Sequence, residues 1–139
     1  DVSYMTISGS VFELNSATSN GGALLVLGGM LDLTNTSFSS NVATLIGGAI
    51  MTYDNAEINS AYLVFELNKA GSYGGAVFVG YFSDAVFDTC EFFGSFASKY
   101  GGALMCQQSD LTMRNCRVLN SSATIQGGGV QFTGDGASE

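Results

Sequence analysis

Apolar and polar residues recur along this chain in one order, five times over. Each recurrence contains a Gly-Gly pair that is followed by a short apolar run and preceded by a polar turn. The pairs start at intervals of 26, 27, 27 and 26 residues, at Gly21, Gly47, Gly74, Gly101 and Gly127. A fixed period of this length is typical of a solenoid built from one repeated structural unit.

Three further slots hold one kind of residue at a fixed distance before each pair. The slot nine residues before the pair is apolar and holds Phe12, Phe38, Phe65, Phe92 and Val118. The slot six residues before it is polar and holds Asn15, Asn41, Asn68, Ser95 and Ser121. The slot four residues before it holds alanine every time, at Ala17, Ala43, Ala70, Ala97 and Ala123. We call these the phenylalanine, asparagine and alanine slots.

Each repeat is predicted to form three short β-strands. One strand follows the Gly-Gly pair, as at 104–106, the next alternates in polarity, as at 111–113, and the third contains the phenylalanine slot. Gly, Asn, Ser and Asp separate the strands, and no stretch has helical periodicity. Because only strands are expected, the predicted fold is all-β. Strands that recur once per turn stack in parallel. The predicted fold is therefore a parallel β-helix of about five coils of 26–27 residues, with three strands per coil, in one segment spanning 1–139.

The slots then acquire structural roles. The phenylalanine slot is predicted to point inward as one apolar stack, and the asparagine slot to form a ladder of hydrogen-bonded amides. The alanine slot fits a corner that is too tight for a larger side chain. The Gly-Gly pair supplies backbone angles that other residues resist.

Side-chain alternation in the strand after the Gly-Gly pair predicts an outward apolar ladder. If the first residue of this strand in each coil, such as Leu24 or Ile50, faces the core, the residue that follows it faces out. The outward ladder consists of Leu25, Met51, Phe78 and Met105, and ends at Gln131. A contiguous apolar ladder usually marks an interface, so we expect another protein surface to cover it. The alternative is that a loop of this same chain covers it, although the even repeats leave little chain for such a loop.

The cysteines also follow the repeat. Cys90 and Cys116 each lie two residues before the phenylalanine slot, so they occupy one slot in adjacent coils. Stacked Cα atoms about 4.8 Å apart are within disulfide range, so the pair is either a disulfide or a ladder of small apolar side chains. Cys106 belongs to another strand and is predicted to be a free, buried thiol.

Charged residues show the same register. Counting from the phenylalanine slot places Asp88 beside Arg114 and Glu91 beside Arg117 in adjacent coils, which predicts two ion pairs. Six carboxylates fall 7 to 11 residues after a Gly-Gly start and are predicted to collect along one polar corner: Asp32, Asp54, Glu57, Asp84, Asp110 and Asp135. Carboxylate oxygens there are weak candidates for Ca²⁺ ligands. A solvated acidic edge is the favoured interpretation, since no calcium-loop motif is present.

Two sequons occur, at Asn35-Thr36-Ser37 and Asn120-Ser121-Ser122. Either asparagine is a candidate for glycosylation if the protein is secreted by a eukaryote.

The composition limits the classes of binding partner and cofactor that the chain is expected to have. The net charge of −8, with only four Lys and Arg residues, argues against nucleic acid and against an anionic membrane surface. The longest apolar run, residues 22–31, is too short to span a bilayer. Histidine is absent and the three cysteines lack CxxC spacing, so neither a metal nor another cofactor is expected.

The recurring Gly-Gly-Ala-[Ile/Leu/Val] motif and the Phe-x-x-Asn motif resemble the repeats of the chlamydial polymorphic outer-membrane proteins. The first four Gly-Gly pairs and the first three phenylalanine slots match these motifs. The fourth and fifth repeats depart from them, with Ser95 and Ser121 in the asparagine slot and Gly127-Gly128-Gly129 in the glycine motif. The resemblance implies a right-handed parallel β-helix that is displayed at a surface and used in adhesion.

We therefore expect an extracellular, cell-surface rod with a structural or adhesive role and no enzymatic activity. One alternative is a segment or subunit of a surface filament. The other is a carbohydrate-active β-helix enzyme of the polysaccharide lyase or hydrolase type, which needs converging carboxylates in a groove built from long loops. Repeats of 26–27 residues leave little room for such loops.

The expected partners are proteins, through self-association or neighbouring domains. The chain begins and finishes part-way through a coil, and neither end carries an amphipathic cap. Contacts are therefore expected end to end as well as laterally, with a surface glycan or receptor as a further candidate partner.

Overall fold

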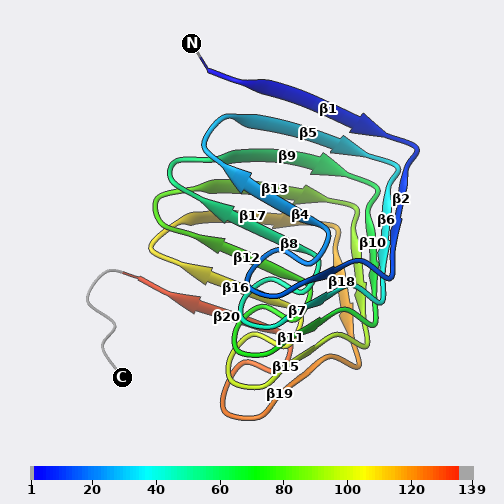
Figure 1. Cartoon of the computed structure of the whole chain (residues 1–139), viewed down its shortest axis with the longest axis vertical. Coiled ribbons are helices and arrows are strands. Elements are labelled where there is room, and N and C mark those ends of the chain that lie inside the picture. Colours follow the sequence, from blue (N-terminus) through cyan, green and yellow to red (C-terminus); the bar gives the residue numbers. More distant parts are fainter. Residues whose placement is uncertain (1, 135–139) are drawn as a thin grey trace.

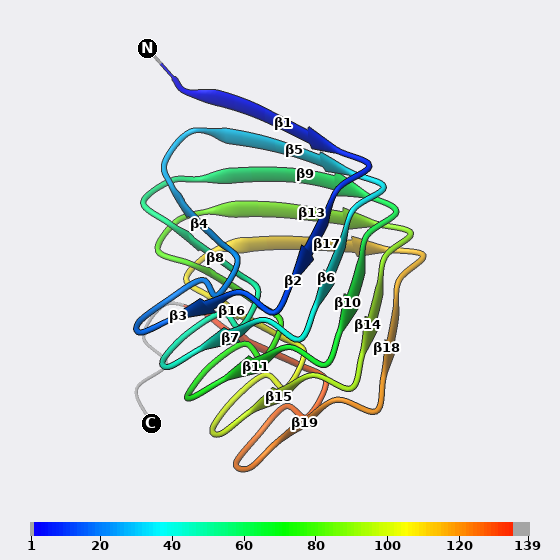
Figure 2. The same cartoon turned by 45° about the vertical axis from the view of Figure 1, so that its right-hand side comes forward.

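The chain winds into a parallel β-solenoid of five coils with four strands in each (Figures 1 and 2). The computed structural model describes residues 2–134, which contain strands and turns and no helix. Coil 1 comprises β1 to β4, coil 2 comprises β5 to β8, and so on to coil 5, which comprises β17 to β20. Every strand pairs in parallel with its counterpart in the next coil, so the predicted β-helix is confirmed.

The strands form four sheets of five, which run along the length of the solenoid. The long-strand sheet contains β1 (Tyr4–Ser8), β5 (Met30–Thr34), β9 (Glu57–Ala61), β13 (Asp84–Asp88) and β17 (Asp110–Arg114). The phenylalanine sheet contains β2 (Val11–Glu13), β6 (Ser37–Ser39), β10 (Val64–Glu66), β14 (Glu91–Phe93) and β18 (Arg117–Leu119). The alanine sheet contains β3 (Ser16–Ala17), β7 (Val42–Ala43), β11 (Lys69–Ala70), β15 (Phe96–Ala97) and β19 (Ser122–Ala123). The glycine sheet contains β4 (Leu24–Leu27), β8 (Ile50–Tyr53), β12 (Val77–Gly80), β16 (Leu104–Gln107) and β20 (Val130–Thr133).

The alanine sheet corrects the predicted number of strands per coil from three to four. The sequence pattern places the alanine slot in a corner, but in the structure it belongs to a two-residue strand that pairs with the same slot in the next coil. Two residues are too few to show alternation of polarity, so sequence periodicity does not reveal such a strand.

The phenylalanine slots form one continuous stack inside the solenoid, as predicted. The ring centroids of Phe12 and Phe38 are 4.9 Å apart, those of Phe38 and Phe65 are 5.0 Å apart, and those of Phe65 and Phe92 are 4.7 Å apart. Neighbouring rings are tilted by less than 10° because each successive coil repeats the backbone path of the one before it. Val118 continues the stack in register with Phe92.

The asparagine slots form the predicted amide ladder. The side-chain Nδ2 of Asn15 donates to Oδ1 of Asn41, and Nδ2 of Asn41 donates to Oδ1 of Asn68, each at 3.0 Å. Each of these Oδ1 atoms also accepts the backbone N–H of the asparagine one coil earlier. The second amide hydrogen is used as well, since Nδ2 of Asn41 donates to the carbonyl of Phe12. The buried amides thus provide hydrogen-bond partners for backbone N–H and C=O groups at the corner that leads to the alanine sheet.

Ser95 interrupts this ladder, and restoring the amide there is expected to stabilise the protein. Ser95 is buried, and its hydroxyl oxygen has no hydrogen-bond partner among the described residues. Ser95→Asn would place Oδ1 where it can accept from Asn68, as happens in the two preceding coils. We expect the free energy of unfolding to rise by about 1 kcal/mol in urea denaturation. The reverse change, Asn41→Ser, serves as the matched control and should lower it by about 1–3 kcal/mol.

The two glycines of each pair have different roles. The first glycine has a positive φ in every coil, between 61° and 66°, which side chains with a Cβ resist. The second glycine lies against the next coil. A Cβ added to Gly75, for example, would overlap the carbonyl oxygen of Gly102 and lie 2.6 Å from the carbonyl carbon of Phe96.

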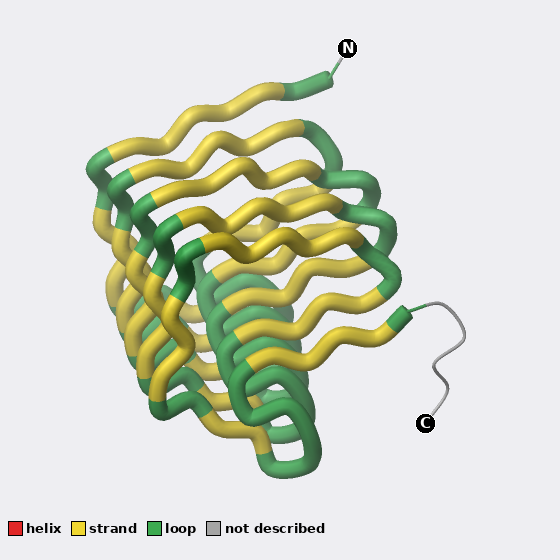
Figure 3. Tube along the Cα trace, turned by 180° about the vertical axis from the view of Figure 1, so that it is seen from behind, coloured by secondary structure: helices red, strands yellow, loops and turns green. Residues whose placement is uncertain are grey.

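In coils 2 to 4, the loop before the Gly-Gly pair covers the outer face of the glycine sheet. Figure 3 shows these loops as a stack of turns beside the strands of that sheet. The loops of adjacent coils are linked by single parallel bridges through Asn20, Ile46, Tyr73, Tyr100 and Gln126.

This covering corrects the predicted lateral interface. Met51, Phe78 and Met105 do point away from the main core, but they are buried in a second apolar cluster, with Phe78 fully inaccessible. The residues that pack on them come from the same chain: Ile46, Tyr73, Tyr81 and Tyr100. The prediction that these three side chains are free to contact another protein is therefore wrong. Leu25 differs, because it is 48% exposed and its coil has the polar Asn20 at the covering position.

Both end coils expose residues that are buried elsewhere. Met5 is 57% exposed, whereas Leu31, its partner in the next coil, is 3% exposed. Phe132 is 62% exposed, whereas its partner Cys106 is fully buried. The end faces of the described solenoid therefore present core side chains together with one unpaired edge of each sheet.

Candidate functional site

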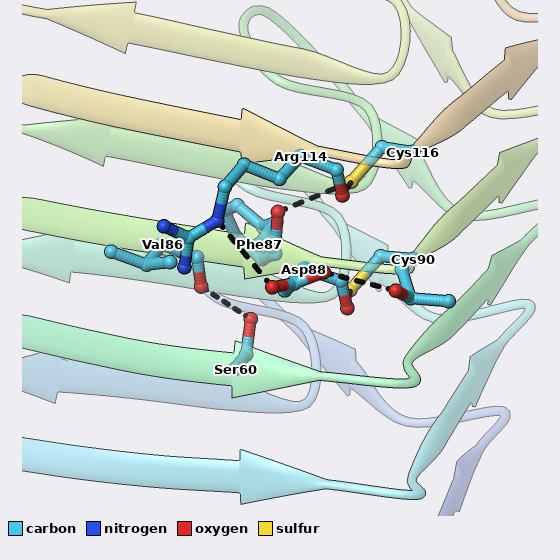
Figure 4. A network of polar contacts seen from close by, with 8 residues as sticks. Ser60, Val86, Phe87, Asp88, Cys90, Arg114 and Cys116 are labelled. Carbon is cyan, nitrogen blue, oxygen red and sulfur yellow. Dashed lines mark hydrogen bonds and ion pairs between the residues drawn. The ribbon is translucent and has the colours of Figure 1, made fainter.

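A network of polar side chains lies where the long-strand sheet turns into the phenylalanine sheet in coils 4 and 5 (Figure 4). The Nε of Arg114 lies 3.4 Å from Oδ2 of Asp88, and the two residues are register partners in β17 and β13. Around the turn, Arg117 Nη1 lies 3.3 Å from Oε2 of Glu91. The structure thus confirms both ion pairs that counting along the sequence predicted. All four side chains are at least one-third exposed, so each pair contributes about 0–1 kcal/mol.

Asp88 is held in its ionised form. The hydroxyl of Thr89 donates to Oδ1 of Asp88 at 2.9 Å, and this bond, together with Asn115 and Arg114, lowers the pKa of the Asp88 carboxyl. A glycosidase-type general acid requires a raised pKa, because it must keep its proton near neutral pH. Asp88 is therefore unsuited to that role.

The Asp88–Arg114 pair borders a shallow hollow of about 350 Å³ on the outer face of the long-strand sheet. Its remaining lining residues are small or polar, and they are Asp32, Thr34, Asn59, Ser60, Ala61 and Val86. Ser60 does not point freely into it, because its hydroxyl donates to the carbonyl of Val86 at 2.7 Å. The hollow offers hydrogen-bonding groups but no nucleophile activated by a base.

All three cysteines are free thiols. Cys106 is fully buried, as predicted, and Cys90 is 2% exposed. Burial is the main cause that raises the pKa of each of these two thiols to about 11. Cys90 and Cys116 do share one slot in adjacent coils, since Arg117 N–H donates to the carbonyl of Cys90 and Thr89 N–H donates to that of Arg114.

The six predicted acidic residues do not form one group. Glu57, Asp84 and Asp110 share one register position in β9, β13 and β17. Asp32 lies two positions further along its strand and accepts a hydrogen bond from the Tyr4 hydroxyl, while Asp54 lies in the preceding turn. Asp135 lies outside the described residues. Across residues 2–134, no three His, Cys, Asp or Glu side chains are arranged to hold a metal ion, so the arrangement does not support the calcium candidates.

Both sequon asparagines lie in exposed turns. Asn35 follows β5 and Asn120 follows β18, with φ values of 49° and 52°. Their accessibility is compatible with glycosylation, which stays a prediction.

The phenylalanine sheet and the turns that follow its strands carry exposed apolar residues that the sequence interpretation missed. Val11 and Leu14 in coil 1 are 69% and 74% exposed, and their counterparts Val64 and Leu67 in coil 3 are 44% and 53% exposed. The available signal was the pentapeptide Val-Phe-Glu-Leu-Asn, which occurs at both 11–15 and 64–68. Only its phenylalanine and asparagine are required by the coil, so the repetition of the valine and leucine was informative.

The geometry defines a class of protein, a parallel β-solenoid whose coils are specified by one repeat. The family model for the Chlamydia polymorphic membrane protein (Chlamydia_PMP) repeat matches residues 9–26 and 35–53. Each matched segment contains one phenylalanine slot, one asparagine slot and one Gly-Gly pair.

A known protein with a similar sequence gives a consistent result. The chain is 36% identical over 72 residues to the probable outer membrane protein pmp21 of Chlamydia pneumoniae. This match covers 48% of the chain and 4% of that protein, so the chain corresponds to a small part of its relative's length. No solved structure matches the chain significantly. The repeats of this chain thus resemble those of the chlamydial polymorphic membrane proteins.

Residues 2–134 contain no helix that is long and apolar enough to cross a membrane.

Proposed function

We propose that this chain is a structural segment of a rod in a cell-surface protein, and that the rod is extended by further coils stacked on its ends. The observation that carries this proposal is the contrast between the buried central ladder and the exposed ends, as in Leu31 against Met5 and Cys106 against Phe132. An exposed strand edge with adjacent core side chains is a template for another strand. The occupant is either a second copy or neighbouring coils of a parent protein.

The surface location rests on the repeat family. The relative's name describes an outer membrane protein, and a β-solenoid with its repeats fits a rod displayed outside the cell. An enzymatic function has less support, because Arg114 is engaged by Asp88 and the pKa of Asp88 is lowered. We therefore favour a non-enzymatic rod.

An adhesive role rests on the exposed apolar pairs of the phenylalanine sheet. Scattered apolar residues are common on surfaces, but pairs repeated in one slot two coils apart are a candidate contact face. Beads that display the chain should lose retention on a target-cell layer when Leu14 and Leu67 are both replaced by serine. Leu45→Ser, an exposed leucine on another turn, is the matched control. Equal retention of both variants and the wild type would count against adhesion through this face.

Gly128→Ala tests end-to-end stacking. In coils 1 to 4, a Cβ on the second glycine of the pair would collide with the next coil, but at Gly128 the nearest atom is 3.6 Å away. The variant should therefore fold with an unchanged unfolding midpoint and yet block a further coil at that end. Sedimentation velocity at rising concentration should show end-to-end assembly of the wild type and monomers of the variant. A wild type that stays monomeric at high concentration, or a variant that assembles equally well, would refute stacking of copies.

A further inference from the structure

The slot shared by Cys90 and Cys116 places two thiols at the spacing of neighbouring strands. The adjacent pairs Asp88–Arg114 and Glu91–Arg117 are in register on either side of it. Neighbouring parallel strands lie about 4.8 Å apart, and a disulfide accepts Cα separations of about 4.4–6.8 Å. Backbone hydrogen bonds from Thr89 and Arg117 hold the two turns together on both sides of the cysteines.

The sulfur of Cys116 points toward coil 4. It lies 3.2 Å from the carbonyl oxygen of Phe87, which belongs to the coil of Cys90, and 3.2 Å from that of Arg114 in its own coil. The sulfur of Cys90 lies 3.3 Å from the carbonyl oxygen of Asp88, the position equivalent to Arg114. The two side chains therefore point in the same direction from equivalent turns, as Figure 4 shows. Cys106 lies in the glycine sheet, outside this slot.

We propose that Cys90 and Cys116 form a disulfide between coils 4 and 5 when the protein reacts with a disulfide oxidant, which is either a small molecule or another protein. The thiolate of Cys116, the more exposed residue, attacks a sulfur of the oxidant and releases one thiol. The thiolate of Cys90 then displaces the second sulfur of the oxidant from Cys116. The balance is two protein thiols and one oxidant disulfide converted into one protein disulfide and two oxidant thiols.

The bond fastens coil 5, in which every described residue is at least partly exposed. Coil 5 packs on coil 4 alone among the described residues, and its inward residues Leu111, Met113 and Val118 are only partly buried. A crosslink between the coils removes the separated arrangements that coil 5 can adopt when it opens. The proposal is independent of the rod function, since it concerns only the cohesion of coils 4 and 5. It suits a surface protein, because disulfides persist outside the reducing cytosol.

The experiment is peptide mapping of the wild-type chain after incubation with oxidised glutathione, with free thiols alkylated before digestion. We expect a peptide pair that joins Cys90 to Cys116 and lacks two hydrogen atoms relative to the reduced pair, with Cys106 alkylated only after denaturation. Hydrogen exchange of the β18 and β19 amides should be about 100-fold slower in the oxidised protein than in the reduced one.

The variants separate the proposal from other outcomes. Cys106→Ser should leave both the crosslink and the slower exchange intact, whereas Cys90→Ser and Cys116→Ser should each abolish them. Far-UV circular dichroism checks that each variant is folded. Three alkylated thiols in the oxidised wild type, a bond that includes Cys106, or a bond between two chains would each overturn the proposal.

Discussion

Gly75→Ala is expected to lower the free energy of unfolding by about 3 kcal/mol or more, or to prevent folding. The added methyl group would overlap the carbonyl oxygen of Gly102 and press on the backbone of Phe96, both in the next coil. Neither contact is with a flexible side chain, so relief requires coils 3 and 4 to separate. Such separation would break the hydrogen bond from Gly75 N–H to the Gly101 carbonyl and its neighbours. Urea denaturation followed by far-UV circular dichroism measures the loss.

Gly128→Ala is the matched control, since it is the same change in the same slot of the last coil. No atom lies within 3.6 Å of the added Cβ, so its expected effect on stability is within about 0.5 kcal/mol. If the two variants were equally destabilised, the second glycine would be required for its own conformation, and contact between coils would not explain the motif.

The main coil architecture could be predicted because each slot repeats five times. A phenylalanine nine residues before each of the first four glycine pairs can stack only if the coils are in register. The same register also placed Asp88 beside Arg114 and Cys90 beside Cys116. Side chains that occupy equivalent slots in adjacent coils become neighbours, so counting residues is enough to find them. The same counting does not reveal whether Cys90 and Cys116 are bonded, because that depends on the oxidant.

The cover over Met51 and Phe78 could not be predicted by the same reasoning. Alternation correctly placed both side chains outside the main core but does not report what lies beyond. The cover comes from Ile46 and Tyr73, one residue before each glycine pair, where the positive φ of the first glycine reverses the chain. A short loop can therefore bury an outer face without any insertion into the repeat. Alternation alone could not distinguish this loop from a partner protein.

The acidic residues could not be grouped correctly by counting residues from the Gly-Gly pair alone. Offsets of 7 to 11 residues after the glycine pair span more than one side-chain position. Glu57 and Asp84 fall at one register position of the long-strand sheet, but Asp32 falls at another and Asp54 in a turn. Register must be exact to one residue before side chains can be grouped, because a shift of one residue moves a side chain to the opposite face.

Phe65→Ala is expected to lower the free energy of unfolding by about 3–5 kcal/mol, the usual cost of truncating a fully buried aromatic residue. Phe65 is fully buried and lies between the rings of Phe38 and Phe92, with centroid distances of 5.0 and 4.7 Å. It also forms a T-shaped pair with Phe87. The coils above and below are fixed by backbone hydrogen bonds, so they cannot close the cavity that the missing ring leaves.

The same truncation at Phe12 separates cavity formation from a general loss of aromatic stacking. Phe12 is only partly buried and has one stacked neighbour, Phe38, because it lies in the end coil. Phe12→Ala should therefore cost less than half as much as Phe65→Ala in urea denaturation. Equal losses would mean that coil 1 is as tightly packed as coil 3, which would contradict the exposed end that supports stacking of further coils.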